Sequence, residues 1–359
     1  MKYRVAKILA EESLSAAGTK TIDLNVTEPI SRIDLRYQIT KSKQAMDGPP
    51  AKDITKIELV DGSDVLHTLS GYENQALCIY DRRVPTMNHG QVINANSQRS
   101  IYGIDFGRFL WDPMFAFLPG NFKNPQLKVT YNTILSDTGA TTPLLEVIAH
   151  IFDEKAVSPA GFLMSKEIYS ATSPASTTFA YVDLPTDYPI RQILLRGYED
   201  AYEPWQAILE ARLDEDNLKR IPFDWDIEQY YQVMKGVWPV VEEALIAEEP
   251  AAGTVFYVTP TDYWCQVIGI SRSSNASVFS TGLNRGGKAT VICSLSTTFS
   301  AIARGYLPNH CIQFPFGLQD EPDDWYDVTK KGSVQLRVRG GLRGGNTSFQ
   351  VVLQQLRKY

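Results

Sequence analysis

The chain has 359 residues, a formal net charge of −6, 43% hydrophobic residues and 21% charged residues. These values are typical of a soluble globular protein that is long enough for two domains, each with its own core. Lysine and arginine are scattered, which argues against nucleic-acid binding as the main function because phosphate contacts need clustered positive charge. The apolar runs fall short of the roughly 20 residues that a membrane span requires. Residues 1–12 also lack the apolar centre of a secretory signal.

The four cysteines are widely spaced and form no C-x-x-C pair, so the sequence supports neither a zinc ribbon nor a dithiol redox motif. We expect buried free thiols, which suit synthesis in a reducing cytoplasm. The cysteines are Cys78, Cys265, Cys293 and Cys311.

The first half of the chain opens with a strand pattern. Apolar and polar residues alternate within residues 19–39, which predicts a β-strand with one face on a core. Residues 56–60 and 65–69 then flank Asp61-Gly62. Because aspartate and glycine tolerate the positive φ of a tight turn, this arrangement predicts a β-hairpin.

A helix is predicted directly after that hairpin. Ser70 and Glu73 match the S-x-x-E capping box, in which the two side chains satisfy backbone N–H groups at a helix start, and helical spacing continues to residue 82. The second half repeats the succession. A hairpin turn at residues 214–217 is followed by Asp226, which can cap a helix over residues 227–234. An equivalent hairpin and helix in both halves indicates an internal duplication.

Two strand sequences support the duplication. Residues 30–36 resemble residues 190–196, an offset of 160 (190 − 30), and residues 126–129 resemble residues 335–338, an offset of 209 (335 − 126). A repeat this long indicates two copies of one domain and not a solenoid. The offset grows by about 50 residues between the two matches, so the second half must carry longer insertions, which we place at residues 236–320.

We divide the chain into an N-terminal domain at residues 1–157 and a C-terminal domain at residues 158–359. The Ser-, Ala- and Pro-rich residues 158–176 are the candidate linker between them. Within the insertions, residues 237–249 are compatible with either a helix or a strand. Further strands are predicted at residues 254–258, 265–270 and 290–293.

No motif points to catalysis. Residues 282–289 approach the phosphate-binding G-x-x-x-x-G-K-[ST] motif, but Ala289 replaces the hydroxyl residue and a strand follows in place of the required helix. We interpret that segment as an inter-strand loop. The histidines are dispersed, and His150 lies in a strand pattern typical of a packed or polar-face residue. The four histidines are His67, His89, His150 and His310.

An acidic run near the C-terminus is interpreted as a solvated loop, with a hard cation such as Ca²⁺ as the alternative. The run comprises Asp320, Glu321, Asp323, Asp324 and Asp327. Residues 340–345 contain a single Arg-Gly-type stretch and are expected to form a tight loop. We therefore expect no catalytic, cofactor-binding or metal-binding residues.

Tryptophan side chains more often fill cores and subunit interfaces than line a sugar-binding face, which is the alternative for this chain. The tryptophans are Trp111, Trp205, Trp225, Trp238, Trp264 and Trp325. Lys2, Arg4 and Lys7 stand among apolar residues and could form a basic arm that contacts a membrane surface or a neighbouring subunit. An ordinary first strand or short helix fits those residues equally well.

The paired halves resemble the double jelly-roll major capsid proteins of tailless icosahedral viruses, in particular those of small lipid-containing bacteriophages. The resemblance is carried by residues 57–66 with the following helix, and by residues 182–191. It implies two eight-stranded rolls side by side, and three chains forming a trimer with a roughly hexagonal footprint that tiles a shell. It also implies outward-facing turrets from the longer insertions, an internal membrane within reach of the N-terminal arm, and no catalytic or cofactor residues.

We therefore expect an all-β fold of two tandem eight-stranded jelly rolls with a few short helices. The expected function is that of a non-enzymatic major capsid protein of the virion, assembled in the host cytoplasm as homotrimers. Its partners would be neighbouring capsomers and minor capsid or vertex proteins, without specific nucleic acid. The alternatives are a two-domain β-sandwich hydrolase of the amidase or glycosidase type, and a carbohydrate-binding adhesin.

Overall fold

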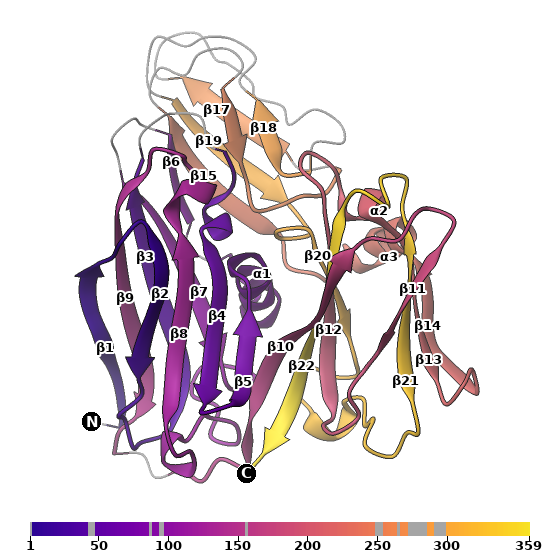
Figure 1. Ribbon diagram of the computed structural model, residues 1–359, viewed down its shortest axis with the longest axis horizontal. Coiled ribbons are helices and arrows are strands. Elements are labelled where there is room, and N and C mark those ends of the chain that lie inside the picture. Colours follow the sequence, from indigo (N-terminus) through magenta and orange to yellow (C-terminus); the bar gives the residue numbers. More distant parts are fainter. Residues whose placement is uncertain are drawn as a thin grey trace.

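The computed structural model consists mainly of β-strands arranged as two rolls side by side, with a tower of further strands above them (Figure 1). Both termini lie at the end opposite the tower. The structure describes residues 2–41, 47–85, 88–92, 97–154, 157–247, 254–263, 266–271, 286–290 and 299–359.

The first roll contains one α-helix and the first nine strands. The elements are β1 (Tyr3–Ser13), β2 (Ala17–Asp23), β3 (Ile30–Thr40), β4 (Ile54–Asp61), β5 (Asp64–Leu69), α1 (Gly71–Arg82), β6 (Asn88–Val92), β7 (Ser97–Asp105), β8 (Pro125–Asn132) and β9 (Thr141–Phe152).

The rest of the chain forms the second roll and the tower. Its elements are β10 (Gly161–Thr172), β11 (Phe179–Asp183), β12 (Ile190–Tyr198), α2 (Pro204–Ala207), β13 (Ile208–Glu215), β14 (Arg220–Asp226), α3 (Ile227–Met234), β15 (Val241–Ala247), β16 (Val255–Tyr257), β17 (Gln266–Ser271), β18 (Lys288–Thr290), β19 (Phe299–Gly305), β20 (Cys311–Pro315), β21 (Val334–Gly340) and β22 (Ser348–Lys358).

The two rolls have the same strand order. In the first roll the sheets run β1-β9-β3-β7 and β2-β8-β4-β5, and in the second they run β10-β22-β12-β20 and β11-β21-β13-β14. In each roll the apolar faces of the two sheets pack against one another, as in a jelly roll, because apolar and polar residues alternate along the strands and the apolar ones point inward. The predicted double jelly-roll is thereby confirmed.

The repeated strands 30–36 and 190–196 occupy equivalent places, in β3 and β12. The Ile30 N–H donates to the Phe117 carbonyl oxygen over 2.7 Å, and the Ile190 N–H donates to the Tyr326 carbonyl oxygen over 2.9 Å. Directly after Ile30 and Ile190, the pairing with β9 and β22 shifts register in the same way. Because such bulges serve local geometry, finding them at matching positions supports one duplicated template.

A side-chain pair is duplicated as well. Gln126 Nε2 donates to Asp23 Oδ1 over 2.7 Å between β8 and β2, and Gln335 Nε2 donates to Asp183 Oδ1 over the same 2.7 Å between β21 and β11. The aspartates differ by 160 residues and the glutamines by 209, the two offsets found in the sequence. The 126–129 and 335–338 repeat therefore also occupies equivalent strands.

Both predicted helix starts are confirmed. The Ser70 backbone N–H donates to Glu73 Oε2 over 2.9 Å, which completes the capping box of α1. At α3, Asp226 Oδ1 accepts from the Gln229 N–H over 3.1 Å. Within the described ranges, no helix reaches the length and apolarity needed to cross a membrane.

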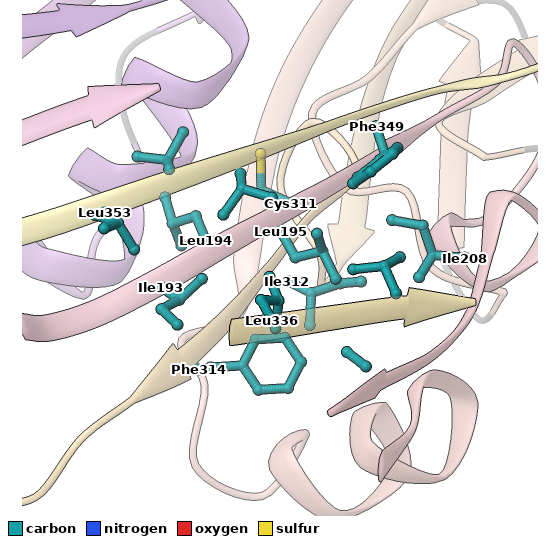
Figure 2. Close-up of a cluster of buried hydrophobic side chains, with 14 of the residues drawn as sticks. Ile193, Leu194, Leu195, Ile208, Cys311, Ile312, Phe314, Leu336, Phe349 and Leu353 are labelled. Carbon is teal, nitrogen blue, oxygen red and sulfur yellow. The ribbon is translucent and has the colours of Figure 1, made fainter. Parts of the chain in front are cut away.

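Each roll buries its own core. In the first roll, Ile33 and Phe117 are completely buried. In the second roll, Leu195, Ile312 and Phe349 come together from three neighbouring strands (Figure 2). Burial of each such side chain contributes roughly 1.5–3 kcal/mol to folding.

The expected linker at residues 158–176 is wrong for most of its length. Residues 161–172 form β10, which pairs with β22 along its whole length and opens the second roll. Phe162 and Leu163 are almost fully buried. A composition rich in Ser and Ala does not prevent a strand when its remaining residues are apolar and a partner strand is available.

The tower fills the insertion in the second roll. Residues 241–247, left open between helix and strand by the sequence, form strand β15, and the strands predicted at 254–258 and 265–270 correspond to β16 and β17. The strand predicted at 290–293 overlaps β18, and its last three residues lie outside the described ranges. Strand β20 pairs with β12 in the roll itself, so the tower strands are β15 to β19.

Phe162→Ala tests whether β10 is a core strand. The ring of Phe162 meets Phe117 edge-on at 5.4 Å between centroids, so its removal leaves a cavity. We expect the free energy of unfolding to fall by about 3–5 kcal/mol in denaturant titration. The control Thr172→Ala, at an exposed position of the same strand, should change it by less than about 0.5 kcal/mol. Equal, small effects of both substitutions would contradict the assignment.

Candidate assembly surfaces

The two rolls meet through a parallel contact between β5 and β10. Thr68 of β5 lies opposite Lys166 of β10, and this pairing joins the sheets β2-β8-β4-β5 and β10-β22-β12-β20 into one sheet of eight strands. The edge of one roll is thus covered by the edge of the next, which removes two exposed strand edges from solvent.

An ion pair marks the lower end of this junction. Arg357 Nη2, at the end of β22, lies 2.7 Å from Asp64 Oδ2 at the start of β5. The hydrogen bond to Asp64 raises the pKa of Arg357. Both side chains are partly exposed, so the pair orients the rolls more than it stabilises them.

A buried polar cluster lies deeper in the junction. Asp81, near the end of α1 in the first roll, accepts from Arg191 over 2.6 Å, Gln192 over 2.7 Å and Gln354 over 2.8 Å, all in the second roll. The side chains of Asp81 and Arg191 are 4% and 3% exposed. A buried charge requires such a partner, so this cluster ties α1 to the second roll in one orientation.

Apolar side chains from both rolls complete the contact. Phe115, from the loop between β7 and β8, packs with Leu163 of β10, Leu356 of β22 and Trp325 of the loop before β21. The rings of Phe115 and Trp325 are 5.9 Å apart. The Tyr80 hydroxyl of α1 donates to the Cys311 carbonyl oxygen over 2.8 Å. The junction therefore combines apolar packing with hydrogen bonds between the two rolls.

Two carboxyl groups approach one another at the same junction. Burial and the neighbouring Glu73 raise the pKa of Glu167 in β10 to about 8, while Arg196 and Lys56 act in the opposite direction. Glu73 is already engaged in the capping box of α1. Glu73 therefore takes part both in the helix cap and in the contact between the rolls.

The base of the tower is tied to the first roll. Gln75 of α1 donates to Asn88 of β6 over 2.8 Å, and Asn88 donates to Thr259 of the insertion over 3.1 Å. The Thr259 backbone N–H in turn donates to Glu243 of β15 over 2.8 Å. Strand β6 also runs parallel to β15, so the tower connects both rolls.

At the outer end of the first roll, β1 is an uncovered edge. Its position in the sheet matches that of β10, since β1 pairs with β9 as β10 pairs with β22. The equivalent residues are not equally buried. Tyr3 is 36% exposed where Leu163 is 1% exposed, and Val5 is 60% exposed where Ser165 is 2% exposed. The surface that β5 covers on β10 is therefore open on β1.

At the outer end of the second roll, β14 is the matching uncovered edge. It follows β13 as β5 follows β4. Trp225 is 37% exposed, whereas the equivalent Leu69 of β5 is 1% exposed. Ile221 is exposed on the same strand. Figure 1 places β1 and β14 at opposite sides of the molecule.

The histidines lie apart from one another. His150 Nε2 lies 2.9 Å from Asp34 Oδ2 on the polar face of β9 and β3, in line with the sequence interpretation. Although burial opposes its ionisation, the hydrogen bond to His150 and the charge of Arg82 lower the pKa of Asp34. His67 and His310 are buried, and burial lowers the pKa of each to about 3. His89 belongs to β6.

The tryptophans do not form an exposed row among the residues that the structure describes. Trp205, Trp238 and Trp325 are buried, Trp111 is partly buried, and Trp225 is exposed. Trp264 lies outside the described residues. This distribution argues against a tryptophan-lined sugar-binding face.

The acidic run is built into a loop. Asp324 Oδ2 accepts from the Leu318 N–H over 2.6 Å, and Asp327 Oδ1 accepts from the Thr329 N–H over 3.0 Å. Arg108 donates to the Asp320 carbonyl oxygen over 2.7 Å, which links this loop to the first roll. These carboxylates therefore have structural roles in the loop before β21.

Cys78 and Cys311 are free and buried, as expected. Cys265, Cys293 and residues 282–285 of the phosphate-loop-like segment lie outside the described residues, while Lys288 and Ala289 belong to strand β18. Lys2, Arg4 and Lys7 do not form a separate arm, because β1 begins at residue 3.

Sequence reasoning missed the Asp81 cluster. Its one signal is a charged residue, Arg191, inside the apolar pattern of β12, and the partner on α1 is more than a hundred residues away.

No protein-family model matches the chain, and no curated protein matches it significantly. Solved structures do. The major capsid protein P2 from bacteriophage PM2 has a TM-score of 0.58 at 11% identity, covering 99% of this chain and 98% of that chain. The STIV major capsid protein has a TM-score of 0.58 at 12% identity, covering 99% and 96%. A chain of Sulfolobus Turreted Icosahedral Virus has a TM-score of 0.61 at 11% identity, covering 99% and 90%.

The chain thus has the fold of double jelly-roll major capsid proteins over nearly its whole length. The predicted resemblance is confirmed at the level of the fold. The matches also span nearly the whole length of the capsid proteins themselves, so both rolls and their order are shared.

Asp81→Ala tests the buried cluster at the junction. The substitution leaves the Arg191 guanidinium buried without its carboxylate, so we expect the free energy of unfolding to fall by about 3–5 kcal/mol in urea titration. The control Asp187→Ala removes the same side chain from an exposed position and should change it by less than about 0.5 kcal/mol. Similar values for the two variants would show that the cluster does not hold the rolls.

Glu167→Gln tests the carboxyl pair. Since the folded pKa of Glu167 lies above its ordinary value of 4.5, the folded protein holds this proton more tightly than the unfolded chain does. The contribution to stability is therefore present below about pH 4.5 and lost as the pH rises toward 8. We expect wild type to lose more melting temperature than the variant between pH 5 and pH 8. An exposed control, Glu321→Gln, should follow wild type, and parallel curves for Glu167→Gln would refute the assignment.

Proposed function

We propose that this chain is the major capsid protein of an icosahedral virus, and that three copies close into a trimeric capsomer of six rolls. The observation that carries the proposal is the pair of uncovered edges, β1 and β14, which repeat the two halves of the β5–β10 contact within the chain. The structural neighbours are viral capsid proteins, which supports a structural role over an enzymatic one.

The geometry of the contact supports a ring. It is heterologous, because edge strand β5 of one roll lies against edge strand β10 of the next and the two edges occupy different places in their rolls. A heterologous contact leads either to a closed ring or to an open filament. With two rolls in each chain, three chains give a six-roll ring whose outline suits hexagonal tiling.

The domain boundaries belong to the same proposal. We take residues 1–157 and 158–359 as the two units of the ring, with the tower as the insertion of the second unit. The tower stands at the end opposite the termini (Figure 1), which supports a turret on the outer face of a shell and termini on the inner face.

Partners beyond the trimer follow from this orientation. Neighbouring capsomers and vertex proteins would contact the sides of the rolls, and the protein would reside in the virion after assembly in the host cytoplasm. A membrane contact through Lys2, Arg4 and Lys7 stays a prediction. Arg4 lies 3.2 Å from Asp153, and Lys7 forms an ion pair with Glu146, so two of these cations already have partners in the roll.

Size-exclusion chromatography with light scattering tests the proposal. We expect a mass near three times the chain mass of 40.2 kDa, and negative-stain images with hexagonal outlines. A monomer at micromolar concentration would contradict the proposal and favour a two-domain hydrolase or a carbohydrate-binding protein. Assays separate those two alternatives, since the hydrolase would cleave a substrate and the carbohydrate-binding protein would bind a glycan.

A further inference from the structure

The contact inside the chain can be mapped residue by residue onto the two uncovered edges. Phe152 at the end of β9 and Leu356 at the end of β22 each donate their backbone N–H to the proline before β3 or β12. The residues that follow them, Asp153 and Arg357, are therefore equivalent positions in the two rolls.

The other side of the contact maps in the same way. Asp64 pairs with the last residue of β4, and Arg220 pairs with the last residue of β13. Asp64 lies six residues before Ser70, the N-cap of the helix in the first roll (70 − 64), and Arg220 lies six residues before Asp226, the N-cap of the helix in the second roll (226 − 220). Asp64 and Arg220 are thus equivalent.

The charges at these equivalent positions are reversed. Inside the chain, Arg357 pairs with Asp64. At the uncovered edges, the acidic Asp153 occupies the position of Arg357, and the basic Arg220 occupies the position of Asp64. The Arg220 side chain is 66% exposed and lies 3.4 Å from Glu215, so a large part of it is accessible to a second partner.

A second pair of positions shows the same reversal. Lys56 and Glu167 line one cavity beside the contact between β5 and β10. Lys7 is equivalent to Glu167. Lys7 is the last residue before a register shift in the pairing of β1 with β9, and Glu167 is the last residue before the corresponding shift in the pairing of β10 with β22. Glu210 is equivalent to Lys56. Lys56 is the first residue after a register shift in the pairing of β4 with β8, and Glu210 is the first residue after the corresponding shift in the pairing of β13 with β21.

We propose that the partner on these edges is a second copy of this chain, with Arg220 of one copy paired to Asp153 of the next and Glu210 paired to Lys7. Within one copy Asp153 already faces Arg4, Lys7 faces Glu146 and Glu210 faces Arg339, so each contact between copies extends an existing ion pair. This inference rests on the proposed trimer and names the residues that select its contacts. Opposite charges meet when β14 of one copy covers β1 of another, as they do when β5 covers β10 within one chain.

The reversal also disfavours an exchange of edges between copies. If β5 left β10 and met β1 of another copy, Asp64 would face Asp153, and if β14 of another copy displaced β5 from β10, Arg220 would face Arg357. Repulsion between like charges disfavours both exchanges.

The test is a charge swap followed by light scattering over a range of protein concentrations. Asp153→Arg should raise the concentration at which half of the chains are trimeric by about tenfold or more, since arginine then faces arginine at all three contacts. Adding Arg220→Asp in the same chain should restore the trimer. Asp153 directly follows β9, which pairs with β1, and Arg220 begins β14. Figure 1 places β1 and β14 at opposite sides of the molecule, so such rescue requires contact between copies.

The matched control combines Asp153→Arg with Lys330→Asp, which has the same net charge as the rescuing variant and changes an 86% exposed lysine. The trimer of this control variant should remain as weak as the trimer of Asp153→Arg alone. The inference would be overturned if the Asp153→Arg trimer were as stable as the wild-type trimer. It would also be overturned if Lys330→Asp restored the trimer as well as Arg220→Asp does. In both cases a trimeric wild type would still uphold the proposed function. A wild-type monomer would overturn both. If Asp153→Arg fails to fold, Lys7→Glu with and without Glu210→Lys makes the same comparison.

Discussion

The parallel contact between β5 and β10 determines how the rest of the molecule is arranged. It is short, with Thr68 opposite Lys166 as its strand pairing, and it would be weak alone. The buried Asp81 cluster and the apolar side chains around Phe115 hold it in place. Because β5 is covered in the first roll and β10 in the second, their equivalents β14 and β1 in the other rolls are left uncovered within the chain. The open edges are a consequence of the duplication and need no separate explanation.

Much of this architecture could be predicted from local sequence patterns. Hairpins and helix caps depend on residues within a few positions of one another, so Asp61-Gly62, Ser70 and Asp226 identified their elements correctly. The duplication was visible because equivalent strands retain similar residues. The linker prediction at 158–176 failed because composition is a weak signal for a strand, whose formation here depends on β22 almost two hundred residues further along the chain.

The surfaces were harder to predict than the fold. Whether Trp225 is exposed while Leu69 is buried depends on which strand covers each edge, and no local pattern contains that information. The same is true of Asp81, whose partners come from the other roll. The two halves have kept the backbone pairing and diverged in the side chains at the edges, so the divergence becomes interpretable only when the strands are aligned in space.

The most direct measurement is an electron cryomicroscopy reconstruction of the purified protein at a resolution that separates strands. Our account predicts rings of six rolls in which β14 of each copy lies alongside β1 of the next, in the arrangement that β5 and β10 have within one chain. A reconstruction in which β1 and β14 both face solvent, or in which two copies meet through a twofold axis, would contradict it.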